Sequence, residues 1–221
     1  EGRRQFTANV SHELRTPLTT ISGYAELLEN HLAASPEDEE KFLSLIRKEA
    51  GRMLSLVEDI LRLSQLDEGS LELKPQPVDV KRMAEDTAAA LAAKAESRDV
   101  RLSVSGHAPE VTTDATLLSE VLYNLLDNAI KYNRPGGQAE ILLDDVNGHV
   151  RIRVKDTGIG IPKEHQQKVF ERFYRVDKSR SKATGGTGLG LSIVKHAAQI
   201  LSADLRLDST PNQGTTVTVV L

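Results

Sequence analysis

Apolar residues recur every three or four positions over the first third of the chain, a spacing that predicts two amphipathic helices. We expect the first helix over about 3–32 and the second over about 36–66. Ser35 precedes Pro36 and a run of acidic residues, which is the pattern of an N-cap and a first helical turn. A hairpin of two such helices leaves apolar surface uncovered, so we expect a homodimeric four-helix bundle.

Pro17 lies inside the first predicted helix, where proline removes one backbone hydrogen bond and clashes with the preceding turn. The helix could therefore end near Thr16 and a second one begin. The apolar stripe nevertheless continues in register through Ile21, Ala25 and Leu28. A single bent helix is the interpretation that this register favours.

The pattern changes after the hairpin, where 67–70 reads as its end and 74–77 as a proline-containing linker. Strands then alternate with helices, and the strands arrive in neighbouring pairs. This order predicts an α+β layer with a mixed sheet covered on one face. We expect domains at 1–68 and 78–221 joined by 69–77, strands near 78–80, 100–105, 111–113, 140–145, 149–155, 204–208 and 215–221, and helices near 81–97, 115–132 and 188–201.

Composition narrows the class of partner. The 28 basic and 32 acidic residues among 221 give a net charge of −4, which offers no case for nucleic-acid binding. The absence of cysteine excludes disulfides and thiolate metal sites and suits a reducing compartment. No apolar run is long enough to cross a bilayer, and the chain starts at Glu1 without methionine. We therefore expect a cytoplasmic fragment of a longer protein.

A polar stripe on the helix predicted over 115–132 is the first candidate for chemistry. Asn124, Asn128 and Lys131 are spaced to share one face, and Tyr132 follows them. Amide oxygens and an ammonium group suit a Mg²⁺–triphosphate, because Mg²⁺ prefers oxygen ligands and phosphate attracts cationic donors. The alternative is a solvated helix face, although asparagine is a poor helix former and two on one stripe need another explanation.

Two glycine-rich segments follow. Asp156–Ile161 (DTGIGI) ends a predicted strand, where a carboxylate and closely approaching glycines would meet a ligand. Gly185–Leu191 (GGTGLGL) opens a predicted helix, so its backbone N–H groups could hold phosphates. The second segment is neither a Walker loop nor a dinucleotide fingerprint, and a flexible loop with a helix cap is its alternative reading. The candidate ligand contacts are Asp156, Gly158, Gly160, Gly186, Thr187, Gly188, Leu189 and Gly190.

The ordered set of motifs resembles the cytoplasmic core of a sensor histidine kinase of two-component signalling. The histidine box SHELRTPL at 11–18 is followed by the asparagine box at 122–132 and the first glycine box at 156–161. A phenylalanine box at 170–175 and the second glycine box at 185–191 complete the order, so the resemblance spans essentially the whole chain. It implies the Bergerat ATP-binding fold for the second domain.

The resemblance also implies roles for individual residues. Asn128 is expected to ligate Mg²⁺ held by the ATP phosphates, with Asn124 in support and Lys131 on a phosphate. Tyr132 is expected to lie against the base, and Asp156 to accept a hydrogen bond from the adenine amine. Residues from about Gly158 to Gly188 are expected to form the ATP lid, with Phe170 and Phe173 packing on the bundle or on the domain.

His12 falls between Val10 and Leu14 of the stripe, which turns its side chain toward solvent. A hydrogen bond to the Glu13 carboxylate would hold one imidazole tautomer and leave the other nitrogen free to attack the γ-phosphate. By resemblance, the phosphoryl group then passes to an aspartate on a response regulator receiver domain. Thr16, one turn from His12, is implied in a phosphatase reaction, although a polar residue before Pro17 needs no such role.

Three functions compete on these grounds. The first is an ATP-dependent protein-histidine kinase, whose parent protein the resemblance implies is anchored in the cell membrane. The second is a non-catalytic, dimeric ATP-sensing module. The third is a gyrase-type or chaperone-type ATPase, which would have no need of the histidine box. The intact His12, Glu13, Asn128 and Asp156 favour the kinase.

Overall fold

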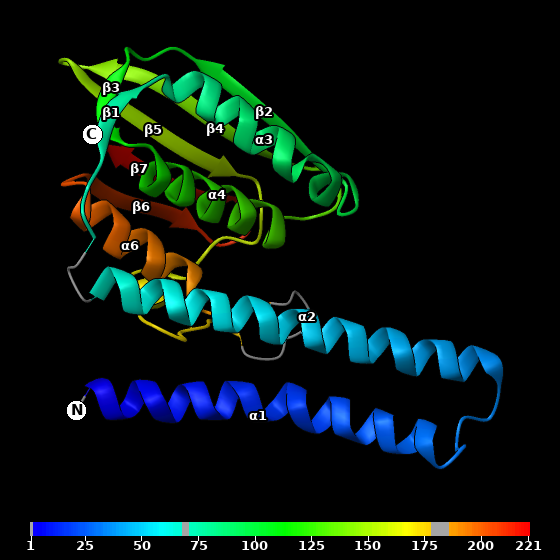
Figure 1. Cartoon of the computed structure of the whole chain (residues 1–221). Coiled ribbons are helices and arrows are strands. Elements are labelled where there is room, and N and C mark those ends of the chain that lie inside the picture. Colours follow the sequence, from blue (N-terminus) through cyan, green and yellow to red (C-terminus); the bar gives the residue numbers. More distant parts are fainter. Residues whose placement is uncertain (1, 68–70, 178–185) are drawn as a thin grey trace. The chain divides into compact units, whose positions relative to one another are not determined.

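The computed structural model describes residues 2–67, 71–177 and 186–221, with side chains from Phe6 onward. These residues form two compact units that divide between Arg62 and Leu63. The first unit is a helical hairpin and the second is a layered α+β unit, as the sequence pattern predicts (Figure 1). Within the described parts, no helix is both long and apolar enough to cross a membrane.

The hairpin consists of α1 (Gly2–Glu29) and α2 (Pro36–Asp67). The first helix ends three residues before its expected end at Leu32, and the second matches its expected bounds closely. Ser35 Oγ accepts a hydrogen bond from the backbone N–H of Asp38 at 3.2 Å, which confirms the predicted N-cap. Tyr24 and Phe42 stack across the hairpin with ring centroids 5.1 Å apart and hold the two helices together near the turn.

Pro17 does not divide α1, because the helix runs without interruption from Gly2 to Glu29. The alternative of two separate helices is therefore wrong. Threonine hydroxyls near the proline donate to carbonyl oxygens one turn back, from Thr19 to Arg15 at 2.9 Å and from Thr20 to Thr16 at 3.2 Å. Side-chain bonds of this kind accompany bent helices, so the bend at Pro17 stays a prediction.

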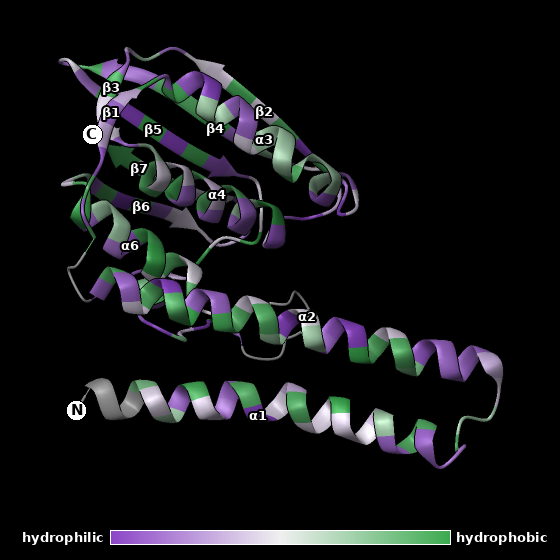
Figure 2. Cartoon of the chain, viewed as in Figure 1, coloured by the Kyte–Doolittle hydropathy of each residue, from purple (hydrophilic) through white to green (hydrophobic). Residues whose placement is uncertain are grey.

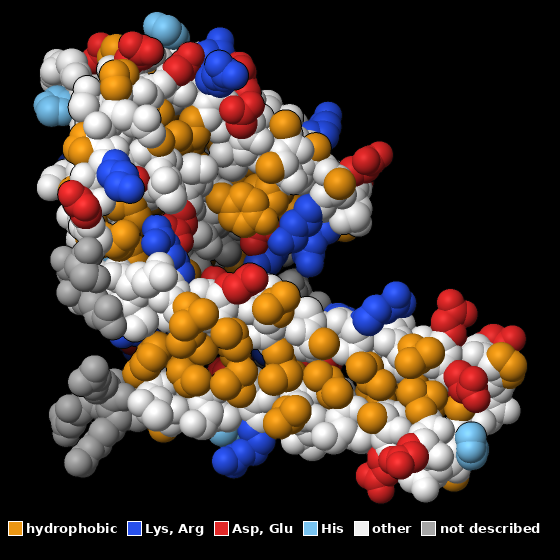
Figure 3. Space-filling view, viewed as in Figure 1, with side chains coloured by type: hydrophobic (Ala, Val, Ile, Leu, Met, Phe, Trp, Pro, Cys, Tyr) orange, Lys and Arg blue, Asp and Glu red, His pale blue; other side chains and the backbone are white. Residues whose placement is uncertain are grey.

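The hairpin carries an apolar surface that its own two helices leave uncovered. Figure 3 shows hydrophobic side chains gathered along both helices. Leu54 and Leu61 are 61% and 59% exposed, which is unusual for leucines that follow one another along a helix face. The large apolar residues of the hairpin that are exposed are Leu18, Leu32, Leu43, Leu54, Val57 and Leu61.

The second unit contains a five-stranded sheet in the order β2-β4-β5-β7-β6. Strands β2 and β4 are parallel and every other neighbouring pair is antiparallel, so the prediction of a mixed sheet is confirmed. The strands are β2 (Val100–Gly106), β4 (Gly137–Val146), β5 (His149–Asp156), β6 (Asp204–Thr210) and β7 (Gly214–Val220).

Three helices cover one face of this sheet, α3 (Val80–Glu96), α4 (Ala115–Lys131) and α6 (Gly190–Ile200) (Figure 1). Figure 2 shows that each of these helices carries both hydrophobic and hydrophilic residues, and their buried residues include Leu91, Leu122 and Ile193. Helix α4 lies centrally and is almost wholly apolar on its buried side. Its fully enclosed residues include Leu117, Leu118, Val121, Leu122, Leu125, Leu126 and Ile130.

A second, two-stranded sheet pairs β1 (Pro75–Val78) antiparallel with β3 (Val111–Asp114). The first strand was expected over 78–80 after a proline linker, but it begins at Pro75 and ends at Val78. The physical reason is Asp79, whose Oδ1 accepts the backbone N–H of Arg82 at 3.0 Å and so starts α3 immediately. Asp114 caps α4 in the same way through Leu117 N.

Two short 3₁₀ helices, η1 (Lys163–His165) and η2 (Lys168–Phe170), lie in the segment between β5 and α6. Helix η2 packs against α6, so the segment that carries Phe170 rests on the second unit. His165 Nδ1 and the Tyr174 hydroxyl form a hydrogen bond of 2.5 Å. Residues 178–185, which the lid was expected to include, lie outside the described part of the chain.

The exposed leucines of the hairpin predict that Leu54→Glu disrupts self-association. A carboxylate in an apolar helix interface would be desolvated without a partner, so the variant is expected to sediment as a monomer and the unaltered chain as a dimer. Ser55→Glu adds the same charge next to the stripe and serves as control. A monomeric unaltered chain, or a dimeric Leu54→Glu variant, would contradict the four-helix bundle.

Candidate active site

The C-terminal half of α4 and the first residue of α6 meet at the polar stripe of α4. A Cβ atom on Gly190 would lie 3.1 Å from Asn124 Oδ1 and 3.9 Å from Asn128 Nδ2. Asn124 itself is held by a bond from its Nδ2 to the backbone oxygen of Glu120 at 2.9 Å. Two motifs that are more than sixty residues apart in sequence are thus in contact, and both asparagines face the N-terminus of α6.

The N-terminus of α6 is suited to an anion. Leu189 occupies the N-cap position and offers no side-chain acceptor to the first N–H groups of the helix. Thr187 Oγ1 accepts the N–H of Leu189 itself at 3.3 Å. Uncapped N–H groups and the positive end of the helix dipole together favour a negatively charged ligand. The second glycine box therefore has the local structure expected of it, from Gly186 onward.

The segment before this helix is fixed by a backbone contact with the phenylalanine box. The N–H of Phe173 donates to the carbonyl oxygen of Gly188 at 2.9 Å. Gly188 has a φ of +75°, and a Cβ there would meet the backbone of Phe173 at 3.0 Å. A side chain at position 188 would therefore strain the backbone and clash with Phe173, which explains a glycine here apart from its expected role near a ligand.

Asp156 ends β5 with its carboxylate held by two backbone N–H groups. Gly158 N donates to Oδ1 at 2.8 Å and Thr215 N donates to the same oxygen at 3.2 Å. Among the described residues, none donates to Oδ2. Burial raises the pKa of Asp156 to about 6, and the bonds from Gly158 and Thr215 offset only part of that rise. A half-buried carboxylate with one oxygen uncommitted is a strong acceptor for a ligand N–H.

The first glycine box lies directly against the end of α4. Ile159 N donates to the carbonyl oxygen of Tyr132 at 3.0 Å. A Cβ on Gly158 would lie 2.2 Å from that oxygen, and one on Gly160 would lie 2.1 Å from the carbonyl oxygen of Thr210. These approaches exclude side chains at both positions, so Asp156 and Tyr132 are held near each other by backbone alone.

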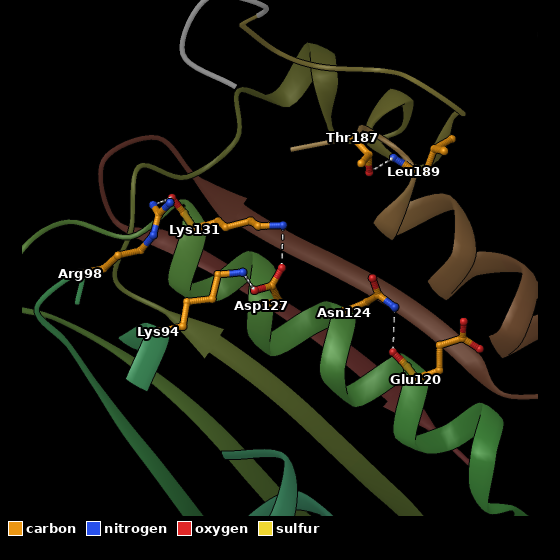
Figure 4. A network of polar contacts seen from close by, with 8 residues as sticks. All are labelled: Lys94, Arg98, Glu120, Asn124, Asp127, Lys131, Thr187 and Leu189. Atoms are coloured by element: carbon orange, nitrogen blue, oxygen red, sulfur yellow. Dashed lines mark hydrogen bonds and ion pairs between the residues drawn. The ribbon is translucent and has the colours of Figure 1, made fainter. Parts of the chain in front are cut away.

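Lys131 is engaged within the protein rather than extended into solvent. Its Nζ lies 2.6 Å from Oδ2 of Asp127, one helical turn earlier (Figure 4). Lys94 of α3 donates to Oδ1 of the same carboxylate. Sequence reasoning missed both Asp127 and Lys94. The available signal was an acidic residue inside the apolar run of α4, four positions before a lysine.

The histidine box lies in the first unit, where His12 is exposed as predicted. Glu13 Oε2 lies 3.6 Å from Arg52 Nη2, which joins the two helices of the hairpin next to His12. Arg52 was not identified from sequence. Thr16 Oγ1 donates weakly to the backbone oxygen of His12 at 3.4 Å, so the threonine is one turn from the histidine.

Comparison with known proteins decides the family. Residues 2–69 match the model of the His Kinase A (phospho-acceptor) domain. Residues 113–221 match the model described as histidine kinase-, DNA gyrase B-, and HSP90-like ATPase. The sensor histidine kinase WalK of Bacillus subtilis (strain 168) is 38% identical over 232 residues, which cover 99% of this chain and 36% of WalK. The chain belongs to the sensor histidine kinases.

Solved histidine kinases share this chain's fold. ThkA, in a crystal structure with the response regulator protein TrrA, gives a TM-score of 0.78 at 25% identity, covering 98% of this chain and 60% of that one. Full-length ShkA, solved in complex with AMPPNP, gives 0.71 at 27% identity over 100% of this chain and 45% of that one. The histidine kinase core described here spans little more than a third of the length of WalK.

The raised pKa of Asp156 predicts how Asp156→Asn changes stability with pH. Between pH 4 and 6 the folded kinase core binds more protons at this site than the unfolded chain, so the native carboxyl lowers stability as pH rises through that window. The asparagine variant lacks this effect while its side-chain oxygen can still accept both backbone bonds. We expect it to be more stable than the unaltered chain by about 2 kcal/mol at pH 8 and equal to it near pH 4.

Thermal unfolding at a series of pH values measures this difference. Asp145→Asn, on the neighbouring strand β4, removes an exposed carboxyl whose Oδ1 accepts the N–H of Gly148 at 2.7 Å, a bond that asparagine can keep, and serves as control. A constant stability difference from pH 4 to pH 8 for Asp156→Asn would contradict the assigned pKa.

Proposed function

We propose that this chain is an ATP-dependent protein-histidine kinase core that phosphorylates His12 and passes the phosphoryl group to an aspartate of a response regulator. The observation that carries the proposal is the contact of α6 with α4, since it joins an uncapped helix N-terminus to two side-chain amides. This combination suits a triphosphate, and an exposed histidine lies on the other unit of the same chain. An ATPase without a phospho-acceptor would not need that histidine.

Asp156 is the proposed adenine contact. Its uncommitted Oδ2 would accept a hydrogen bond from the exocyclic amine, which adenine has and which guanine replaces with a carbonyl oxygen. The same carboxylate would repel that oxygen, so one residue supplies both attraction and discrimination. Tyr132, which the Ile159 bond ties to the same loop, is the proposed neighbour of the base, and Gly158 and Gly160 allow the loop to approach the backbone of Tyr132 and Thr210 closely.

The phosphates are proposed to bind between α4 and the N-terminus of α6. Asn128 and Asn124 would contribute amide oxygens, Lys131 an ammonium group, and residues Gly186, Thr187, Gly188, Leu189 and Gly190 backbone N–H groups. Amide oxygens are ligands that suit Mg²⁺, and the Asn128 amide lies near the first residue of α6. Asn128 therefore fits as a protein ligand to Mg²⁺ held mainly by phosphate oxygens and water, where the ion would neutralise phosphate charge.

In the proposed reaction the unprotonated nitrogen of the His12 imidazole attacks the γ-phosphorus. The nitrogen–phosphorus bond forms as the bond from that phosphorus to the bridging β–γ oxygen breaks, and ADP leaves. Glu13 would hold the N–H of the other ring nitrogen and so fix the tautomer, and the Arg52 ion pair would hold Glu13. Thr16 is the proposed position for orienting water in a phosphatase reaction on the receiver.

The partners follow from the same proposal. ThkA was crystallised with a response regulator protein, and a receiver domain is the proposed acceptor for His12 here as well. The uncovered leucine stripe supports a homodimer made through the hairpin. We further propose a functional division into a phosphotransfer hairpin at 1–68 and a catalytic domain at 78–221, in a cytoplasmic core whose parent protein is anchored in the cell membrane.

Incubation with Mg-ATP labelled on the γ-phosphate tests the reaction. We expect protein-bound label that is lost in acid, stable in alkali and absent from His12→Gln, because phosphohistidine is a phosphoramidate. His31→Gln, on the same hairpin, removes a different histidine and should label normally. Label that resists acid or persists in His12→Gln would refute the kinase. Nucleotide binding without any label would favour the ATP-sensing module, and ATP hydrolysis without label the ATPase.

A further inference from the structure

Three charged side chains meet at the end of the proposed phosphate site. Asp127 is only 7% exposed, which is rare for an aspartate without partners. Lys131 Nζ lies 2.6 Å from its Oδ2, and Lys94 reaches Oδ1 from α3. Figure 4 shows both lysine side chains converging on Asp127, with Asn124 further along the same helix. Each carboxylate oxygen thus has its own ammonium group.

Two lysine ammonium groups pair with one buried carboxylate, so the positive charges exceed the negative charge by one. Burial by itself raises the pKa of Asp127, but the two ammonium groups, Lys131 first, outweigh it and the pKa is lowered. The side chain of Lys131 is 20% exposed and that of Lys94 36% exposed, so neither is enclosed as Asp127 is. The cluster carries a net charge of +1 at neutral pH, next to the place proposed for a triphosphate.

A phosphate contact by Lys131 would compete with the bond to Asp127. If Asp127 had only Lys131 as partner, release of that lysine would leave a buried carboxylate unpaired, which is unfavourable. Lys94 removes most of this cost because it approaches the other oxygen from a different helix. Its bond does not depend on the position of the Lys131 side chain.

We propose that Lys94 is a positioning residue for nucleotide binding, which stays with Asp127 as a counter-ion while Lys131 transfers from that carboxylate to a nucleotide phosphate. Lys94 acts through Asp127 and does not itself touch the nucleotide. The inference rests on the proposed function, since it takes Lys131 as a phosphate contact. It adds a residue from α3, outside every motif box, to the determinants of ATP affinity.

Binding of Mg-AMPPNP to the whole chain, measured by calorimetry, tests the exchange. We expect Lys94→Met to weaken binding about tenfold, because Lys131 would then have to leave Asp127 unpaired. Lys81→Met, which removes an exposed lysine from the first turn of the same helix, should bind like the unaltered chain. Lys94→Arg keeps a cation beside Asp127 and should retain most of the affinity.

The deciding comparison is made with Asp127→Asn. A neutral amide needs no counter-ion, so this variant should bind at least as tightly as the unaltered chain, and Lys94→Met should have no further effect in it. If Lys94 acted only as a distant positive charge, Lys94→Met would weaken binding equally in the unaltered chain and in the Asp127→Asn variant. That result would overturn the proposal. So would unchanged affinity in Lys94→Met, or loss of affinity in Lys94→Arg equal to that in Lys94→Met.

The inference and the proposed function fail in different ways. If the unaltered chain does not bind Mg-AMPPNP, the proposed function fails and the inference with it. If Lys131→Met weakens binding but Lys94→Met does not, only the inference fails. Thermal unfolding of each variant shows whether it is folded at the temperature of the titration, and a Lys94→Met variant that is folded and binds normally overturns the proposal.

Discussion

The candidate site depends on the close approach of the first residue of α6 to the side-chain amide of Asn124. At this point a helix N-terminus with uncapped N–H groups meets a polar stripe, and a side chain at Gly190 would stand 3.1 Å from the amide oxygen. The approach is possible because the buried side of α4 is filled by leucines that pack it on the sheet. Packing on one side of α4 thus fixes the geometry of ligand binding on the other.

The two aspartates of the candidate site are held by different kinds of donor. Asp127 lies between Lys131 and Lys94 and holds both, while Asp156 lies at the end of β5, bonded to two backbone N–H groups. The two aspartates have opposite pKa shifts for a physical reason. Asp127 gains two ammonium partners that outweigh its burial, whereas Asp156 gains only amide donors and its pKa rises to about 6.

Much of this architecture could be predicted from sequence, because periodicity, helix caps and motif order are local signals. The hairpin, the mixed sheet and the exposed position of His12 follow from such signals. Contacts between distant segments could not be predicted in the same way. Neither the Glu13 ion pair with Arg52 nor the approach of Lys94 to Asp127 has a sequence spacing that indicates it. The start of β1 at Pro75 was missed for a related reason, since its partner β3 lies over thirty residues away.

Gly190→Ala tests whether phosphates bind where α6 meets α4. The added methyl group fills the space beside Asn124 without changing any charge, and alanine is a better helix former than glycine, so the fold should keep its stability. Gly23→Ala, on α1 with nothing within 4 Å of the new methyl group, serves as control. We expect Mg-AMPPNP affinity, measured by calorimetry, to fall about tenfold in Gly190→Ala and to stay constant in Gly23→Ala. Unchanged affinity in a folded Gly190→Ala variant would contradict phosphate binding at this place.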